Sequence, residues 1–279
     1  MALKNLLVHV DDNKACAARV RAAIDLAIAH EAHLAGVYVI SDPSPATFVG
    51  GYLPPETLDM LQRQLRERAD AALARFTEVA KRNQISFETR TDGVLSTAMA
   101  EALATHARYA DVVILGQADP ADAEAPRSLP EEVTLASGRP SLVIPYIGPA
   151  ATLGQRVTVA WDASREAARV VNDALPLLER AQAVGVVTVN PSETPFGHGE
   201  QPGADIALHL ARHGIKVDVQ RIESRDVDVA NIILSHIADQ SSDLLVMGAY
   251  GHSRLRELVL GGVTRTILRD MTVPVLMAH

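Results

Sequence analysis

The sequence is poor in the residues that cross-link small secreted proteins, that span membranes or that attract nucleic acids. It has one cysteine, so no intramolecular disulfide can form, and this suits a reducing compartment. No apolar run approaches the ~18 residues that a membrane span needs. Acidic residues exceed basic ones, giving a net charge of −8, which argues against a nucleic-acid surface. We therefore expect a cytoplasmic protein with no nucleic-acid or membrane partner.

Several catalytic and cofactor-binding motifs are also missing. The sequence has no Walker A loop, no Gly-x-Gly-x-x-Gly and no Gly-x-Ser-x-Gly elbow. His209 and His213 have a spacing that can bind zinc, but Leu210 stands where a zinc protease has glutamate, so we expect two surface histidines and no metal site. Cys16 lies among alanines, which favours a buried structural thiol over a redox sensor. No catalytic residue stands out.

The chain appears to contain one unit twice. Residues 5–10 followed by Asp11 match residues 157–161 followed by Asp162, and residues 111–116 match residues 243–248. The segment 147–155, rich in glycine and small residues, is typical of a linker. We predict two domains, residues 1–147 and 155–279, which agrees with a length of 279 residues.

Apolar strands alternate with helices in both halves, which predicts α/β domains with parallel sheets covered on both faces. The expected strands are 5–10, 34–40, 85–91, 111–116 and 141–146, then 156–161, 184–189, 216–222, 243–248 and 274–278. The expected helices are 14–31, 56–83, 95–108 and 131–137, then 164–180, 203–213, 227–240 and 263–271. With the strand order 3-2-1-4-5, Asp162 and Gly248 would flank the crevice in which such sheets bind ligands.

The last 37 residues carry the strongest functional signal. A buried strand ends at Gly248, Gly251 completes a turn, and the pair Gly261-Gly262 comes just before a helix. Glycine lets the main chain approach a ligand closely, and free N–H groups at a helix start hold phosphate well. Spacing alone does not separate this anion site from a plain strand-turn-helix with surface arginines.

The glycine spacing resembles the carboxy-terminal signature of the universal stress protein family: Gly, two residues, Gly, nine residues, Gly and a hydroxyl residue. Gly262 departs from it, because the hydroxyl is missing. The resemblance extends over both halves and implies a tandem member with two open, doubly wound, five-stranded parallel sheets of the Rossmann-like, adenine-nucleotide alpha hydrolase type. It implies adenine-nucleotide contacts, with ATP ahead of ADP or AMP and with or without magnesium, at Asp162, Val189, Met247, Gly248, Gly251, Gly261, Gly262, Val263 and Thr264.

The first half keeps Asp11 but loses the glycine run. Asp119 stands where the second glycine would be, and Asp122, Glu124, Glu131 and Glu132 make the region acidic. Such a loop repels phosphate. We therefore expect one nucleotide site, in the second half, and a vestigial site in the first.

The leading hypothesis is a regulatory protein of the stress response that binds ATP, with an unknown protein partner and homodimerisation as further implications of the resemblance. One alternative is a slow ATPase or nucleotidyl-transfer enzyme. Phosphoryl transfer usually needs a metal and a positioned base, and Glu257 is the one acidic residue in the glycine loop, so catalysis would be slow. Another is an interaction module with an empty pocket, which the Gly262 departure favours. The resemblance also implies that the last strands of the halves, 141–146 and 274–278, pair over a short length.

Overall fold

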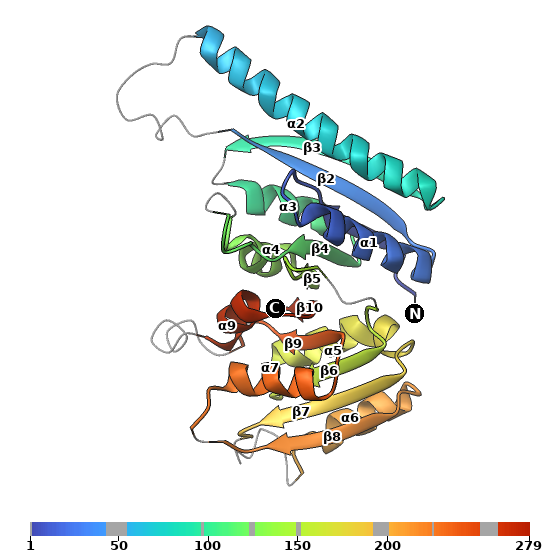
Figure 1. Ribbon diagram of the computed structural model, residues 1–279. Coiled ribbons are helices and arrows are strands. Elements are labelled where there is room, and N and C mark those ends of the chain that lie inside the picture. The colour runs from blue at the N-terminus through green and yellow to red at the C-terminus, as the bar shows by residue number, and fades with distance from the viewer. Residues whose placement is uncertain are drawn as a thin grey trace. The chain divides into compact units, whose positions relative to one another are not determined.

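The computed structural model describes residues 2–42, 55–95, 98–122, 126–148, 152–191, 201–224, 226–251 and 262–279. These residues form two compact units, a first unit of Leu3–Arg139 and a second unit made chiefly of Pro140–His279. Each unit is an α/β structure in which a parallel or mostly parallel sheet lies between two layers of helices (Figure 1). No helix in the described part of the chain is long and apolar enough to cross a membrane.

The sheet of the first unit has the order β3-β2-β1-β4, with all strands parallel. Helices α1 and α2 contact one face, and α3 and α4 lie against the other. The elements are β1 (Asn5–His9), α1 (Cys16–His30), β2 (His33–Asp42), α2 (Pro55–Arg82), β3 (Phe87–Leu95), α3 (Met99–Ala107), β4 (Val112–Gly116) and α4 (Leu129–Ser137).

The second unit has the order β5-β10-β9-β6-β7-β8. Helices α5 and α6 cover one face and α7 and α9 the other. The elements are β5 (Ser141–Ile144), β6 (Arg156–Ala160), α5 (Arg165–Leu178), β7 (Ala183–Val189), α6 (Ala204–Arg212), β8 (Val217–Ile222), α7 (Val229–Asp239), β9 (Leu244–Gly248), α9 (Val263–Asp270) and β10 (Val275–Ala278).

Buried central strands explain the long apolar runs in the sequence. All of Val112–Leu115 in β4 and Leu244–Met247 in β9 are buried, as expected for parallel strands covered on both faces. A carboxylate precedes each of these strands: Asp111 accepts from the Lys4 and Asn5 N–H groups at 2.6 and 2.9 Å. Asp243 accepts from the Gln155 and Arg156 N–H groups at 3.1 and 2.9 Å. An aspartate before the fourth strand thus fixes the start of the first strand in each unit.

The predicted elements and the order of strands in the second unit are confirmed. From β8 to β10 the order is third, second, first, fourth and fifth, so the strand order reverses between β6 and β9. The short pairing of the last strands is also confirmed, because β5 runs antiparallel to β10 through Val143–Val275, Leu142–Leu276 and Ser141–Met277. β5 belongs to the second compact unit, in which it pairs with β10. The predicted domains, residues 1–147 and 155–279, are drawn from the sequence repeat and stay a prediction.

Candidate functional site

Asp162 lies just beyond the carboxyl end of β6, at the point where the strand order reverses. Its Oδ1 accepts from the Ser164 N–H at 3.0 Å, and Ser164 Oγ in turn accepts from the Ala167 N–H at 3.1 Å. Ser164 therefore caps α5, and Asp162 closes the turn before it. Asp162 is exposed at the carboxyl ends of the strands, where ligands bind in folds of this kind.

Val189 ends β7 beside this turn. The Trp161 N–H donates to the Val187 carbonyl at 2.9 Å, and the Asn190 N–H donates to the Ile222 carbonyl at 2.9 Å. Because bonding alternates along a parallel strand, the peptide groups of Val189 face the β6 side, beyond the last bond between β6 and β7. Its N–H and C=O therefore offer a donor and an acceptor side by side at the crevice.

The turn after β9 needs glycine for packing. A Cβ atom added to Gly248 would lie 2.6 Å from the backbone nitrogen of Ala167, so only glycine lets β9 approach the start of α5 this closely. A Cβ atom added to Gly251 would lie 2.9 Å from Glu166 Oε2 and 3.2 Å from Ser164 Oγ. Between them Tyr250 has a φ of 60°, an uncommon value for a bulky residue and one associated with binding sites.

The start of α9 faces the same turn. Gly262 is its N-cap with φ −52° and ψ 144°, and the Gly262 carbonyl accepts from the Arg265 and Thr266 N–H groups at 3.0 and 3.2 Å. No acidic residue lies in the first turn of α9. The buried Thr264 links the two segments, because its Oγ1 accepts from the Tyr250 N–H at 3.4 Å. The positive end of this helix therefore points to a site suited to an anion.

A cavity of about 290 Å³ joins these segments. Its lining includes seven of the predicted site residues: Asp162, Val189, Met247, Gly248, Gly251, Val263 and Thr264. Gly262 lies directly before Val263 at the N-cap of α9, and Gly261 lies outside the described residues. The cavity is mostly apolar, with few polar groups, as is typical of sites for small molecules.

Sequence reasoning missed part of the lining. The rest of the cavity wall is made of Ala160, Trp161, Val187, Asn190, Val229, Ile233 and Tyr250. Trp161 and Asn190 could have been found, because each adjoins a residue that the sequence had singled out. Val229 and Ile233 had no signal, because their apolar spacing on α7 does not distinguish a cavity wall from the core.

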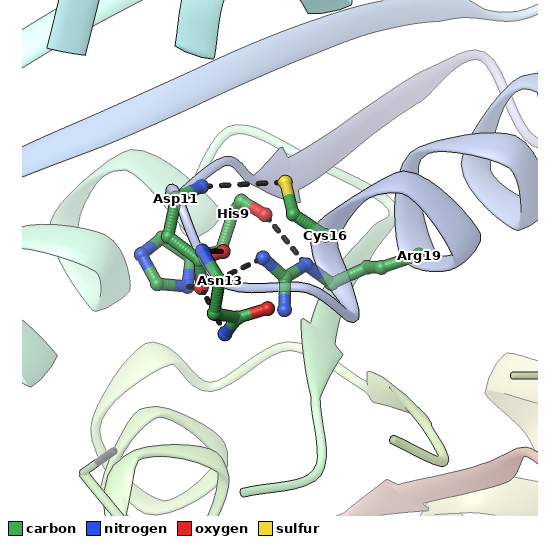
Figure 2. Close-up of polar contacts among 5 residues, drawn as sticks. All are labelled: His9, Asp11, Asn13, Cys16 and Arg19. Carbon is green, nitrogen blue, oxygen red and sulfur yellow. Dashed lines mark hydrogen bonds and ion pairs between the residues drawn. The ribbon is translucent and has the colours of Figure 1, made fainter. Parts of the chain in front are cut away.

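The equivalent place in the first unit holds a buried cation (Figure 2). The Arg19 side chain is only 2% exposed; its Nη2 lies 2.8 Å from Asp11 Oδ2, and its Nε donates to the His9 carbonyl at 2.7 Å. Asp11 also accepts from the Asn13 N–H and side-chain amide at 3.2 and 2.9 Å. The Asp11 N–H donates to Cys16 Sγ at 3.4 Å.

Burial and charge shift the acid–base properties of this cluster. Burial and the Arg19 charge lower the pKa of His9 from 6.5 to about 4. The pKa of Asp11 is lowered because attraction to Arg19 and His9, with the hydrogen bonds from Arg19 and Asn13, outweighs the opposing effect of burial. Burial raises the pKa of the Cys16 thiol, and this fits the structural role predicted for it.

Another prediction concerns a metal site at His209 and His213. The rings of His209 and His213 lie 4.9 Å apart, and no group of three or more histidine, cysteine or acidic side chains in the described residues could hold a metal ion. The loops that follow the second strand of each half, residues 41–55 and 190–202, lie largely outside the described residues, as do Glu124 and Glu257.

Residues 154–279 match the model of the universal stress protein family. A universal stress protein of Synechocystis is 39% identical over 67 residues, a match that covers 24% of this chain and 22% of that protein. The solved universal stress protein of Archaeoglobus fulgidus superposes with a TM-score of 0.73 at 18% identity, covering 98% of this chain and 95% of that one. A putative universal stress protein from Pseudomonas aeruginosa gives a TM-score of 0.57 at 17% identity, covering 99% and 92%. The fold of the whole chain is therefore that of universal stress proteins.

Proposed function

Residues 154–279 belong to the universal stress protein family, and from this premise we propose that the second unit binds one adenine nucleotide per chain. The bound nucleotide, with ATP expected first, would set the regulatory state of a stress-response protein. The observation that carries the proposal is that one cavity brings together Asp162, the end of β7, the turn from Gly248 to Gly251 and the start of α9.

Each part of the cavity suits one part of a nucleotide. Adenine presents a donor and an acceptor on the same edge, which the Val189 C=O and N–H complement. The exposed carboxylate of Asp162 can accept from ribose hydroxyl groups. The phosphates would lie against Gly251, Gly262 and the N-terminus of α9, where free N–H groups and the helix dipole favour negative charge.

The first unit supports the proposal of a single site. Arg19 already pairs with the carboxylate that corresponds to Asp162, and α4 begins with Glu131 and Glu132 in its first turn, where α9 has no acidic residue. A phosphate would meet two carboxylates at the start of α4. We therefore assign the first unit a supporting role without nucleotide.

Calorimetric titration with ATP, ADP, AMP and adenosine tests the proposal, and mass analysis of what co-purifies with the chain identifies the natural ligand. We expect one site per chain, with ATP at ~100 times its dissociation constant stabilising the unit that binds it by about 2.7 kcal/mol. Two equal sites per chain, or a melting curve that millimolar nucleotide leaves unchanged, would overturn the proposal. Release of phosphate from bound ATP would assign the site to an ATPase.

A further inference from the structure

A buried carboxylate lies directly behind the glycine turn of the second unit. Glu166 is 5% exposed, and its Oε2 occupies the space into which a side chain at Gly251 would point, 2.9 Å from the position of a Cβ atom. Gly251 itself lines the cavity, whereas Glu166 is not among the lining residues. One glycine therefore separates this carboxylate from the place where phosphates would bind.

Among the described residues, the charge of Glu166 is paired with that of Arg165. Its Oε1 lies 3.1 Å from Arg165 Nη2, but the Arg165 side chain is 92% exposed, so solvent screens that positive charge. The amino end of α5 also stabilises Glu166, which sits in its first turn. The positive end of α5 thus serves an internal anion, while the positive end of α9 stays directed at the cavity.

We propose that Glu166 is a positioning residue that makes the site sensitive to ligand charge, a role that rests on the proposed nucleotide site. Through Gly251, the buried carboxylate repels phosphate groups, so a triphosphate binds well only when a divalent cation neutralises part of its charge. An uncharged nucleoside in the same cavity does not sense Glu166. The ligand class is then the magnesium complex of a nucleotide rather than the free polyanion.

Replacing Glu166 by glutamine tests this role, because the amide keeps the shape of the side chain and removes the charge. Binding of ATP in EDTA, ATP with Mg²⁺ and adenosine is measured calorimetrically for both proteins. At an effective dielectric constant near 20, a unit charge ~6 Å away corresponds to about 100-fold in binding before solvent and salt screen it. We expect Glu166→Gln to tighten ATP binding in EDTA about tenfold, with a two- to threefold effect in Mg²⁺ and none for adenosine.

The matched control is Glu179→Gln, which makes the same charge change at the exposed far end of α5 and should leave all three affinities unchanged. If circular dichroism shows that Glu166→Gln does not fold, Glu166→Met replaces the carboxylate by an apolar side chain of similar size, and the same order of effects is expected.

Unchanged or weaker ATP binding in EDTA by the neutral variant would overturn this role, and weaker binding would mean that the carboxylate holds the turn in place. A wild-type affinity for ATP that does not respond to Mg²⁺ would overturn it as well. Wild-type protein that binds neither ATP nor adenosine would instead refute the proposed nucleotide site. The adenosine measurement therefore separates the two failures.

Discussion

The carboxyl end of the first strand is built alike in the two units, yet it is used differently. Asp11 and Asp162 each follow that strand by two residues, and each accepts from the N–H group two residues further on. In the first unit Asp11 also pairs with the buried Arg19, the fourth residue of α1, whereas the fourth residue of α5 is the uncharged Ala168. One side chain on the following helix separates an internally neutralised carboxylate from an exposed one.

The glycine that ends the fourth strand shows the same contrast. A Cβ atom added to Gly116 would lie 2.1 Å from Arg19 Nη1, while one added to Gly248 would meet the backbone of Ala167. Guanidinium thus fills the place beside Gly116. In the second unit, the helix backbone packs directly against the glycine, and the space beyond it remains as the cavity. The two strand ends therefore differ in what packs against their glycine, a guanidinium in the first unit and a helix backbone in the second.

Removing Arg19 should give the largest effect on this comparison. Arg19→Met leaves Asp11 without its buried partner and should cost about 3–5 kcal/mol of stability in the first unit. Urea unfolding followed by circular dichroism measures the loss, and fluorescence of Trp161, the single tryptophan, reports on the second unit. The control Arg21→Met removes the exposed Arg21–Asp25 pair of the same helix and should cost less than about 1 kcal/mol. Equal costs for the two variants would contradict the importance of the buried pair.

Acid should destabilise the first unit through His9. Its pKa is about 4 in the fold and 6.5 in the unfolded chain, so the unfolded state binds more protons between these values. Stability is then complete above pH 6.5 and falls by about 3 kcal/mol as pH drops toward 4. Unfolding curves across this range for wild type and His9→Gln measure the effect.

The variant His9→Gln should flatten the pH dependence between pH 4 and 6.5, while His213→Gln, at the exposed end of α6, should leave it as in the wild type. Asp11 acts in the same direction at lower pH, because its lowered pKa means that its stabilisation is lost only in stronger acid. A variant that keeps the full wild-type slope would show that other groups cause it.

Substituting Gly251 should break the second unit's site. Valine there would collide with Glu166 Oε2 and Ser164 Oγ and displace the turn, and we expect ATP binding to weaken at least about 100-fold, or ~2.7 kcal/mol. Gly185→Val is the matched control, because a Cβ atom added at Gly185 has no neighbour within 4 Å. Calorimetric titration compares the two. A larger effect from Asp119→Gly in the first unit would reverse the assignment of the site.

The smallest expected effect comes from a substitution at Gly262. Its φ of −52° is open to any residue, and it is the N-cap of α9, a position that serine favours. A hydroxyl that bonds a charged phosphate is worth roughly 1.5–3 kcal/mol, so Gly262→Ser should tighten ATP binding by about tenfold or more and leave adenosine unchanged. Titration of both ligands checks this. Equal or weaker ATP binding would show that the missing hydroxyl does not limit the site.

Much of the architecture could be predicted from the sequence because its signals are local. Apolar runs such as residues 112–115 and 244–247 mark buried strands, and their alternation with helices requires parallel order. The glycines at 248 and 251 and the carboxylate at 162 follow from strand ends and family spacing, and the cavity brings them together. A residue that directly follows a predicted strand can be placed from the sequence, because the strand itself is predicted from local patterning.

Only the tertiary structure decided what surrounds the corresponding strand ends of the two units. The sequence indicated repulsion in the first unit from its acidic loop, but nothing in it indicated that Arg19 would turn inward to Asp11 and Gly116. Nor did it place Glu166 behind Gly251 or turn Tyr250 to a positive φ. These features depend on how closely a helix start approaches a strand that lies far along the chain. Local propensity and periodicity hold no information about that distance, because close packing of the folded chain sets it.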